Sequence, residues 1–167
     1  MGYHDHKEHL PANVSCAVLI ISGSRTLKTD ESGKYIVAKL EESGNIVTDY
    51  SIIGNDPDQI LGTIEKLFND GVTQAIITSG GTGASSQDIT IETITPILDK
   101  KMDGFGELFR TLTYQEIGTG SILSRAMAGI INGKVIISLP GSLAAVKLAT
   151  NNIIIPELAH LVREASR

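Results

Sequence analysis

Four short apolar segments, each followed by a turn of small residues, constrain this chain more than any other feature. The segments are Val14–Ile21, Asn45–Ile53, Gln74–Ser79 and Lys134–Leu139. They are short and contain many β-branched residues, and these two properties together predict strands. Largely continuous apolar character is typical of strands that are covered on both faces of a sheet.

Segments with the apolar spacing of helices lie between and after the expected strands. Asp30, Asp56 and Ser142 stand where N-caps are expected, because their side chains can accept hydrogen bonds from a first helical turn. The expected helices cover Asp30–Glu42, Asp56 to about Gly71, a segment from Asp88 onward, Phe105–Tyr114, Ile122–Ile130 and Ser142 to about Glu164.

This alternation of strands and helices predicts the fold class. We expect an α/β fold, a single compact doubly wound domain with a mainly parallel sheet covered by helices on both faces. The domain should occupy residues 14–167. Residues 1–13 should form a mobile N-terminal arm, and we interpret its three histidines as part of a polar tail because no fourth metal ligand is evident.

The composition argues against several classes of protein. The net charge of −5 disfavours a nucleic-acid or anionic-membrane binder held by bulk electrostatics. The single cysteine, Cys16, excludes an internal disulfide and a multi-cysteine metal site, and its place in an expected strand predicts a small buried hydrophobe. Neither a membrane-spanning run nor a signal peptide is evident. We therefore expect a soluble cytoplasmic protein.

The turns at the carboxyl ends of the expected strands are the candidate binding site, because open α/β sheets bind ligands there. The turn Thr78-Ser79-Gly80-Gly81-Thr82-Gly83 is the clearest candidate. Its glycines can bring backbone N–H groups close to a ligand, and its hydroxyl groups add donors. This pattern favours a phosphate or a phosphate-bearing cofactor. An ordinary strand-to-helix turn is the alternative, since it also needs glycine.

Several side chains near these turns have two interpretations. Asp88 lies just after the glycine turn, where its carboxylate could bind a divalent metal or cap a helix. Asp56 has the same two interpretations. For Ser142 the cap is favoured over ligand binding. Arg125 and Glu107 are expected to line the same face as the turns, although Arg125 could also be an ordinary surface arginine.

Five motifs together resemble a known family. They are Thr78–Gly83, Asp88-x-Thr90, Asp103–Glu107, Leu123–Ala126 and Leu139–Ser142. In this order they are similar to the MoaB/Mog family, the molybdopterin adenylyltransferase-like group of molybdenum cofactor biosynthesis. The resemblance runs from Val14 to about Leu161, and the segment 104–129 looks closer to the MoaB branch.

The resemblance implies a function as well as a fold. Active members of the family bind molybdopterin and, with Mg²⁺, transfer AMP from ATP to its terminal phosphate, releasing pyrophosphate. The family also implies a homotrimer or a homohexamer. By this resemblance Asp88, with Asp56 or Asn55, would hold the metal and serve catalysis. The turn 78–83 would hold phosphates, and Ser142 would hold the pterin or the nucleotide. The other binding residues implied are Ser22, Ser24, Thr90, Glu107, Ser124, Arg125, Pro140 and Gly141.

One position departs from the family pattern. Adenylylating members carry an aspartate in the loop after the second strand, where this chain has Gly54-Asn55, with Asp56 one residue later. Asparagine can bind a metal through its carbonyl oxygen but adds no charge. Two functions therefore stay open at this point. One is an adenylyltransferase, and the other is a non-catalytic paralogue that binds molybdopterin or a nucleotide.

Overall fold

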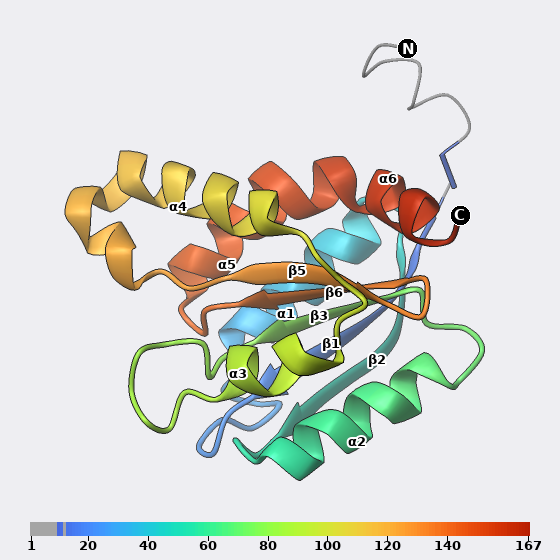
Figure 1. The fold of residues 1–167 in the computed structure, drawn as a ribbon, viewed down its shortest axis with the longest axis horizontal. Coiled ribbons are helices and arrows are strands. Elements are labelled where there is room, and N and C mark those ends of the chain that lie inside the picture. The colour runs from blue at the N-terminus through green and yellow to red at the C-terminus, as the bar shows by residue number, and fades with distance from the viewer. Residues whose placement is uncertain (1–9, 12) are drawn as a thin grey trace.

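A computed structural model describes residues 10, 11 and 13–167 of the chain (Figure 1). The three histidines of the expected arm, His4, His6 and His9, lie outside the described residues. Within the described part of the chain, no helix is long and apolar enough to cross a membrane.

A six-stranded sheet with the order β2-β1-β3-β6-β5-β4 forms the centre of the molecule. The first four strands in this order are parallel, whereas β5 and β4 run antiparallel to their neighbours. The mainly parallel sheet confirms the predicted fold class. The strands are β1 (Ser15–Ile21), β2 (Ile46–Ile53), β3 (Ala75–Ser79), β4 (Lys100–Lys101), β5 (Met127–Ile131) and β6 (Lys134–Leu139).

Helices cover both faces of this sheet, and successive residues of the buried strands point to opposite layers. In β1, Val18 and Ile20 pack into the layer of α1, α4, α5 and α6, whereas Leu19 and Ile21 pack into the layer of α2 and α3. Cys16 is fully buried in the first layer, as predicted, and burial raises the pKa of its thiol to about 12. The helices are α1 (Glu31–Glu42), α2 (Pro57–Phe68), α3 (Thr90–Ile94), α4 (Asp103–Ile117), α5 (Leu143–Ala149) and α6 (Ile155–Ala165).

Shorter helical turns connect several of these elements. A 3₁₀ turn, η2 (Thr95–Ile97), extends α3, and another, η3 (Gly118–Leu123), extends α4. A π-helical turn, η4 (Thr150–Ile154), joins α5 to α6. The last predicted helix is therefore one continuous helical segment with a wider turn in its middle.

The prediction of a helix over Ile122–Ile130 is wrong. Helical structure ends at Leu123, and β5 begins at Met127 as the first strand of a hairpin with β6. The hairpin turns at Asn132 and Gly133, which both have positive φ (49° and 74°). An Asn-Gly pair between two strands is typical of the tight turn that suits their twist. This dipeptide was the overlooked signal for the hairpin.

Candidate functional site

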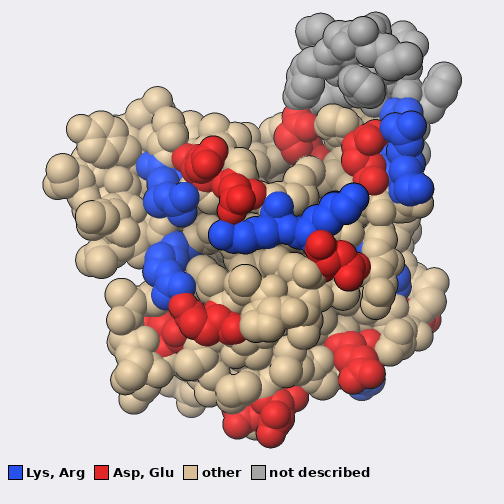
Figure 2. Space-filling view, in the orientation of Figure 1, with Lys and Arg blue, Asp and Glu red and all other residues tan. Residues whose placement is uncertain are grey.

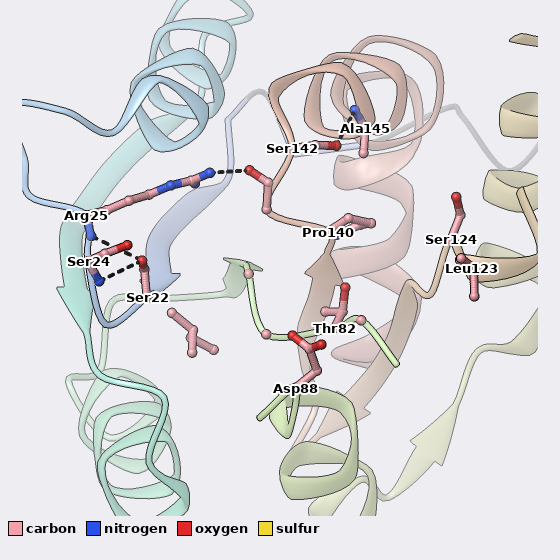
Figure 3. Close-up of a pocket in the computed structure, with 15 residues that line it drawn as sticks. Ser22, Ser24, Arg25, Thr82, Asp88, Leu123, Ser124, Pro140, Ser142 and Ala145 are labelled. Atoms are coloured by element: carbon pink, nitrogen blue, oxygen red, sulfur yellow. Dashed lines mark hydrogen bonds between the residues drawn. The ribbon is translucent and has the colours of Figure 1, made fainter. Parts of the chain in front are cut away.

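The carboxyl ends of β1, β3 and β6 open onto one pocket of about 490 Å³ (Figure 3). This volume lies within the ordinary range for sites that bind small molecules and cofactors. The segment after each strand supplies part of the wall, and the end of η3 closes another side. The lining residues are Ile21, Ser22, Ser24, Arg25, Gly80, Gly81, Thr82, Gly83, Asp88, Leu123, Ser124, Pro140, Gly141, Ser142 and Ala145.

The turn after β3 has a backbone conformation and close contacts that require glycine. Gly80 and Gly81 have φ values of 109° and 64°. A Cβ atom at Gly80 would lie 2.2 Å from the carbonyl oxygen of Ile21, and one at Gly81 would lie 2.4 Å from Oγ1 of Thr90. The turn therefore presses against β1 and the start of α3, and its main chain forms the floor of the pocket.

Three hydroxyl residues predicted as ligand contacts instead hold the turns in place. Thr78 donates to Oγ of Ser138 at 2.9 Å, and Ser79 donates to the carbonyl oxygen of Pro140 at 3.0 Å. Thr90 donates to the carbonyl oxygen of the first glycine of the turn at 2.9 Å. All three are fully buried and do not line the pocket. Their hydrogen bonds fix the β3 turn against the β6 turn and α3.

Asp88 lines the pocket, and its carboxylate is held mainly by Ser85 of its own loop. Oδ2 accepts hydrogen bonds from the main-chain N–H of Ser85 at 3.0 Å and from its hydroxyl at 2.7 Å. The side-chain hydrogen bond from Ser85 is the main reason that the pKa of Asp88 is lowered from its usual value. Of the two interpretations of Asp88, the helix cap is wrong, because α3 begins at Thr90 with Ile89 as its N-cap and no side-chain cap bond. Asp88 is therefore a charged group at the pocket.

Arg125 and Glu107, expected on the same face, lie in different places. Arg125 donates to the carbonyl oxygen of Gly83 at 2.8 Å and forms an ion pair with Glu92, so it braces the glycine turn from outside the lining. This pairing is the main cause that lowers the pKa of Glu92. Glu107 lies on α4 in a separate depression with Arg110. The structure does not bring Glu107 to the pocket.

The serines predicted on the other turns lie at the pocket. The hydroxyl of Ser22 accepts from the main-chain N–H groups of Ser24 and Arg25 at 3.3 and 3.2 Å, so it shapes the turn after β1. Ser142 accepts from the N–H of Ala145 at 3.3 Å, which confirms it as the N-cap of α5, and it also lines the pocket. Ser124 lines the opposite wall at the end of η3.

The clearest residue that the sequence reasoning missed is Arg25. Its guanidinium donates from Nη2 to the carbonyl oxygen of Gly141 at 2.7 Å (Figure 3). Its Nη1 pairs with Asp30 at 3.3 Å. Arg25 lies in the turn after β1, one of the candidate turns at the strand ends, but nothing in the spacing of that turn indicates the arginine. Gly141 is 116 residues away along the chain, so the contact depends on the sheet topology.

Asn55 and Asp56 lie beside the pocket but do not line it. Asp56 is the N-cap of α2, as predicted, and accepts from the N–H of Gln59 at 2.9 Å. Asn55 donates through Nδ2 to the carbonyl oxygen of Gln87, next to Asp88. Its Oδ1 is buried and has no hydrogen-bond partner among the described residues. This oxygen is therefore an available acceptor beside the loop that carries Asp88.

Two opposite charges define the chemistry that the pocket permits. Arg25 and Asp88 are the two lining residues with a formal charge, and the remaining lining side chains are small, hydroxyl-bearing or aliphatic. Such a site suits a ligand with anionic groups that shares a cation with the protein. In the described part of the chain, no three His, Cys, Asp or Glu side chains gather to form a metal site without a ligand.

Comparison with known proteins relates this fold and pocket to one family. Residues 17–160 match the family described as "Probable molybdopterin binding domain". The chain is 46% identical over 165 residues to molybdenum cofactor biosynthesis protein B of Bacillus subtilis (strain 168), covering 98% of this chain and 97% of that protein.

Solved structures agree with the sequence comparison. A crystal structure of a molybdenum cofactor biosynthesis protein B is similar with a TM-score of 0.90 at 42% identity, covering 94% of this chain and 98% of that chain. The tungsten cofactor synthesizing protein MoaB from Pyrococcus furiosus is similar with a TM-score of 0.86 at 36% identity, covering 94% and 99% of the two chains. These relatives confirm the resemblance drawn from the five motifs, including the closeness to the MoaB branch.

Proposed function

Because the chain belongs to the molybdopterin-binding-domain family of molybdenum cofactor biosynthesis proteins, we propose that it transfers an adenylyl group from ATP to molybdopterin. The observation that carries this proposal is that Asp88 and Arg25 line one pocket together with the glycine turn. That arrangement offers separate positions for anionic phosphates and for a cation bound to them. Molybdopterin, ATP and Mg²⁺ are the ligands that we propose for it.

The residues present fit a magnesium ion that is shared with the substrate. Mg²⁺ in phosphoryl-transfer sites is commonly held by one or two carboxylates together with substrate phosphates. Asp88 supplies one ionised carboxylate at the pocket, and the unpartnered Oδ1 of Asn55 lies by the same loop. Bound there, the ion would neutralise charge on the phosphates. Asp56 is engaged as the cap of α2, so we assign the metal to Asp88 and, second, to Asn55.

In the proposed reaction the nucleophile belongs to the substrate. An oxygen of the terminal phosphate of molybdopterin forms a bond to the α-phosphorus of ATP. The bond from that phosphorus to the bridging oxygen breaks, and pyrophosphate leaves with the electron pair. The protein contributes by positioning the two phosphates and by stabilising their charge, which is how most phosphoryl-transfer enzymes accelerate the reaction. The rigid glycine turn and the hydroxyl groups of Ser22 and Ser142 suit this role.

A second candidate function is a binding protein without transferase activity. The observation in its favour is that Asn55 brings no charge, while Asp56 holds the N–H of Gln59 instead of facing the pocket. Under this alternative the protein binds molybdopterin or a nucleotide in the same pocket. It would then release no pyrophosphate, and Asn55→Asp would gain activity by adding the second charge near the phosphates.

The two candidates are separated by one assay. Purified protein is mixed with molybdopterin, Mg²⁺ and ATP, and both pyrophosphate and adenylylated pterin are measured. The transferase predicts both products from the wild type and neither from Asp88→Asn, with unchanged folding by circular dichroism. Pterin binding without either product would reject the transferase. Full activity of Asp88→Asn would reject the role of Asp88.

We also propose that the molecule assembles into a homotrimer or a homohexamer. An exposed apolar surface on α4 and η3 supports self-association, and we call it the α4–η3 face. It consists of Leu108, Tyr114, Ile117, Ile122 and Leu123, each between 46% and 81% exposed in the single chain. Because Leu123 also lines the pocket, this face continues to the rim of the site.

A further inference from the structure

Arg25 is the positively charged residue of the pocket lining, and Asp88 is the negatively charged one (Figure 3). Arg25 follows β1, whereas Asp88 belongs to the loop after β3. The pocket therefore carries a cation on the side of the turn after β1 and an anion beneath the glycine turn. An anionic group of a ligand is attracted to the Arg25 end.

A fully buried carboxylate holds this arginine. Asp30, whose exposure is 0%, pairs through Oδ1 with Nη1 of Arg25 at 3.3 Å. Its Oδ2 accepts hydrogen bonds from the N–H of Gly33 at 3.0 Å and from the hydroxyl of Tyr50 at 2.7 Å. A buried charge needs such partners, because removing a carboxylate from water is otherwise strongly unfavourable.

The start of α1 is shaped around this carboxylate. A Cβ atom at Gly33 would lie 2.2 Å from Oδ2 of Asp30 and 2.6 Å from the ring of Tyr50. Burial, followed by the hydrogen bond to Asp30, raises the pKa of the Tyr50 hydroxyl, so this group stays protonated and acts as a donor. The contacts therefore form a fixed support and not a chance surface pair.

The guanidinium is anchored at a second point and keeps free donors. The carbonyl oxygen of Gly141 accepts from Nη2 of Arg25 at 2.7 Å and from the hydroxyl of Ser32 at 3.0 Å. The two bonds made by Arg25 use two of the five N–H donors of a guanidinium. The other three have no partner in residues 10, 11 and 13–167. Free donors on a planar, permanently charged group suit the oxygens of a phosphate.

We propose that Arg25 binds a phosphate group of the ligand, and that Asp30 is the positioning residue that holds its guanidinium toward the pocket. The inference rests on the proposed function for the identity of the ligand, a nucleotide or a phosphorylated pterin. It goes beyond that function by assigning the phosphate to one side chain and the geometry of that side chain to a buried carboxylate.

Binding measurements by calorimetry test the role of Arg25. The probes are ATP and adenosine, each with Mg²⁺. Arg25→Gln should weaken ATP binding by about tenfold or more, because a hydrogen bond to a charged group is lost, and should leave adenosine binding unchanged. Lys28→Gln is the matched control, since Lys28 is exposed in the same loop and outside the lining. Equal ATP affinity in Arg25→Gln and the wild type would overturn the proposal.

The sign of the effect tests the role of Asp30. Asp30→Asn removes a negative charge near the anion end, so electrostatics alone predicts tighter binding of ATP. Positioning predicts weaker binding, by about tenfold, because the guanidinium loses its ion pair with Asp30 and keeps only the hydrogen bond to Gly141. Tighter or unchanged ATP binding in a folded Asp30→Asn protein would reject the positioning role.

A second variant keeps the test valid if Asp30→Asn does not fold. Arg25→Lys retains the charge, but one ammonium nitrogen replaces the two nitrogens of the planar fork that separately reach Asp30 and Gly141. It should weaken ATP binding severalfold, and wild-type affinity in this variant would contradict the proposal. Thermal unfolding curves verify that each variant is folded.

The outcome does not depend on turnover. A wild type that binds ATP through Arg25 but releases no pyrophosphate would keep this inference and reject the transferase. A wild type that turns over, with an Arg25→Gln variant that binds ATP equally well, would reject the inference and keep the transferase. Absence of ATP binding by the wild type would overturn the inference.

Discussion

Gly81 shows how a single residue determines the shape of the pocket floor. Its φ of 64° is unfavourable for any residue with a Cβ atom, and a Cβ there would lie 2.4 Å from Oγ1 of Thr90 and 2.9 Å from Oδ1 of Asn55. Gly81→Ala should therefore lower the free energy of unfolding by about 1–3 kcal/mol and weaken ATP binding. Chemical denaturation and calorimetry measure these two effects.

The control for Gly81→Ala is a glycine with open space around it. Gly62 lies within α2, and no atom lies within 4 Å of a Cβ built on it. Gly62→Ala should raise the free energy of unfolding by about 0.5–1 kcal/mol, because glycine is unfavourable inside a helix, and should leave ATP binding unchanged. Equal effects of the two substitutions would contradict the account of the turn.

A second prediction at the residue scale concerns the ionisation of Asp88. Its pKa is lowered mainly by the hydroxyl of Ser85, so Ser85→Ala should raise it toward the ordinary value. The lowered pKa means that this contact stabilises the fold above the unfolded-state pKa, and that the contribution disappears as pH falls through the folded-state pKa. The difference in unfolding free energy between wild type and Ser85→Ala should therefore shrink on acidification.

Carboxyl-carbon NMR of Asp88 measures this pKa directly, and denaturation at several pH values measures the stability. Ser86→Ala is the matched control, because Ser86 is exposed and makes no described hydrogen bond to Asp88. An unshifted titration in Ser85→Ala, or an equal shift in Ser86→Ala, would refute the assigned cause.

Residues of the candidate site were predictable where a short stretch of sequence is by itself typical of ligand binding. The glycine turn and Asp88 follow a buried strand, and strand ends are where ligands bind in such sheets. Arg25 and the brace from Arg125 were not predictable in this way, because their contacts join residues 116 and 42 positions apart. The sequence suggests that the hydroxyls of Thr78 and Ser79 contact a ligand. In the structure both are buried and donate to β6 and the turn after it.

At the scale of elements, the hairpin of β5 and β6 turns on two residues with positive φ. Asn132 has a φ of 49°, which asparagine tolerates better than most residues with a Cβ atom. Asn132→Ala should lower the free energy of unfolding by about 1 kcal/mol. Asn132→Gly should stay closer to the wild type, because glycine adopts this conformation readily. Denaturation curves in which the alanine variant is as stable as the glycine variant would contradict the backbone argument.

The elements differ in how much of their structure the sequence reveals. Among the four predicted parallel strands, β1, β3 and β6 combine continuous apolar character with β-branching, whereas β2 also contains Asp49 and Ser51. β5 was mistaken for a helix, because the segment before it does form a 3₁₀ turn and its apolar residues permit either period. β4 consists of two lysines at the edge of the sheet and has no apolar signal of its own. Its pairing depends on β5, which the sequence reading had already missed.

At the scale of the whole molecule, the pocket is assembled from segments that are distant along the chain. The parallel arrangement of β1, β3 and β6 brings their carboxyl ends to one edge of the sheet. The end of η3, which follows α4, lines the same pocket. The predicted fold class was therefore enough to place the first three turns together. Predicting that Leu123 and Ser124 line the pocket would have required knowing that α4 is followed by a 3₁₀ turn beside the site.

The α4–η3 face is the largest gathering of exposed apolar side chains in the described residues. It holds five of the nine exposed large hydrophobic residues in the described part of the chain. Figure 2 shows mostly uncharged side chains at the left end of the molecule, where α4 lies in Figure 1. Contiguous apolar surface of this kind is typical of protein interfaces. We therefore expect a trimer or a hexamer of the 17.8 kDa chain in light scattering after size exclusion.

Substitution within this face tests the assembly. Ile122 is 81% exposed in the single chain, and Ile122→Asp would place a charge in the proposed interface. It should shift the protein to smaller species while the far-ultraviolet circular dichroism stays unchanged, because the side chain supports little of the monomer core. Val72→Asp is the control, since Val72 is 56% exposed but lies away from this face. A monomeric wild type, or equal dissociation by both variants, would show that copies of the chain do not meet through α4 and η3.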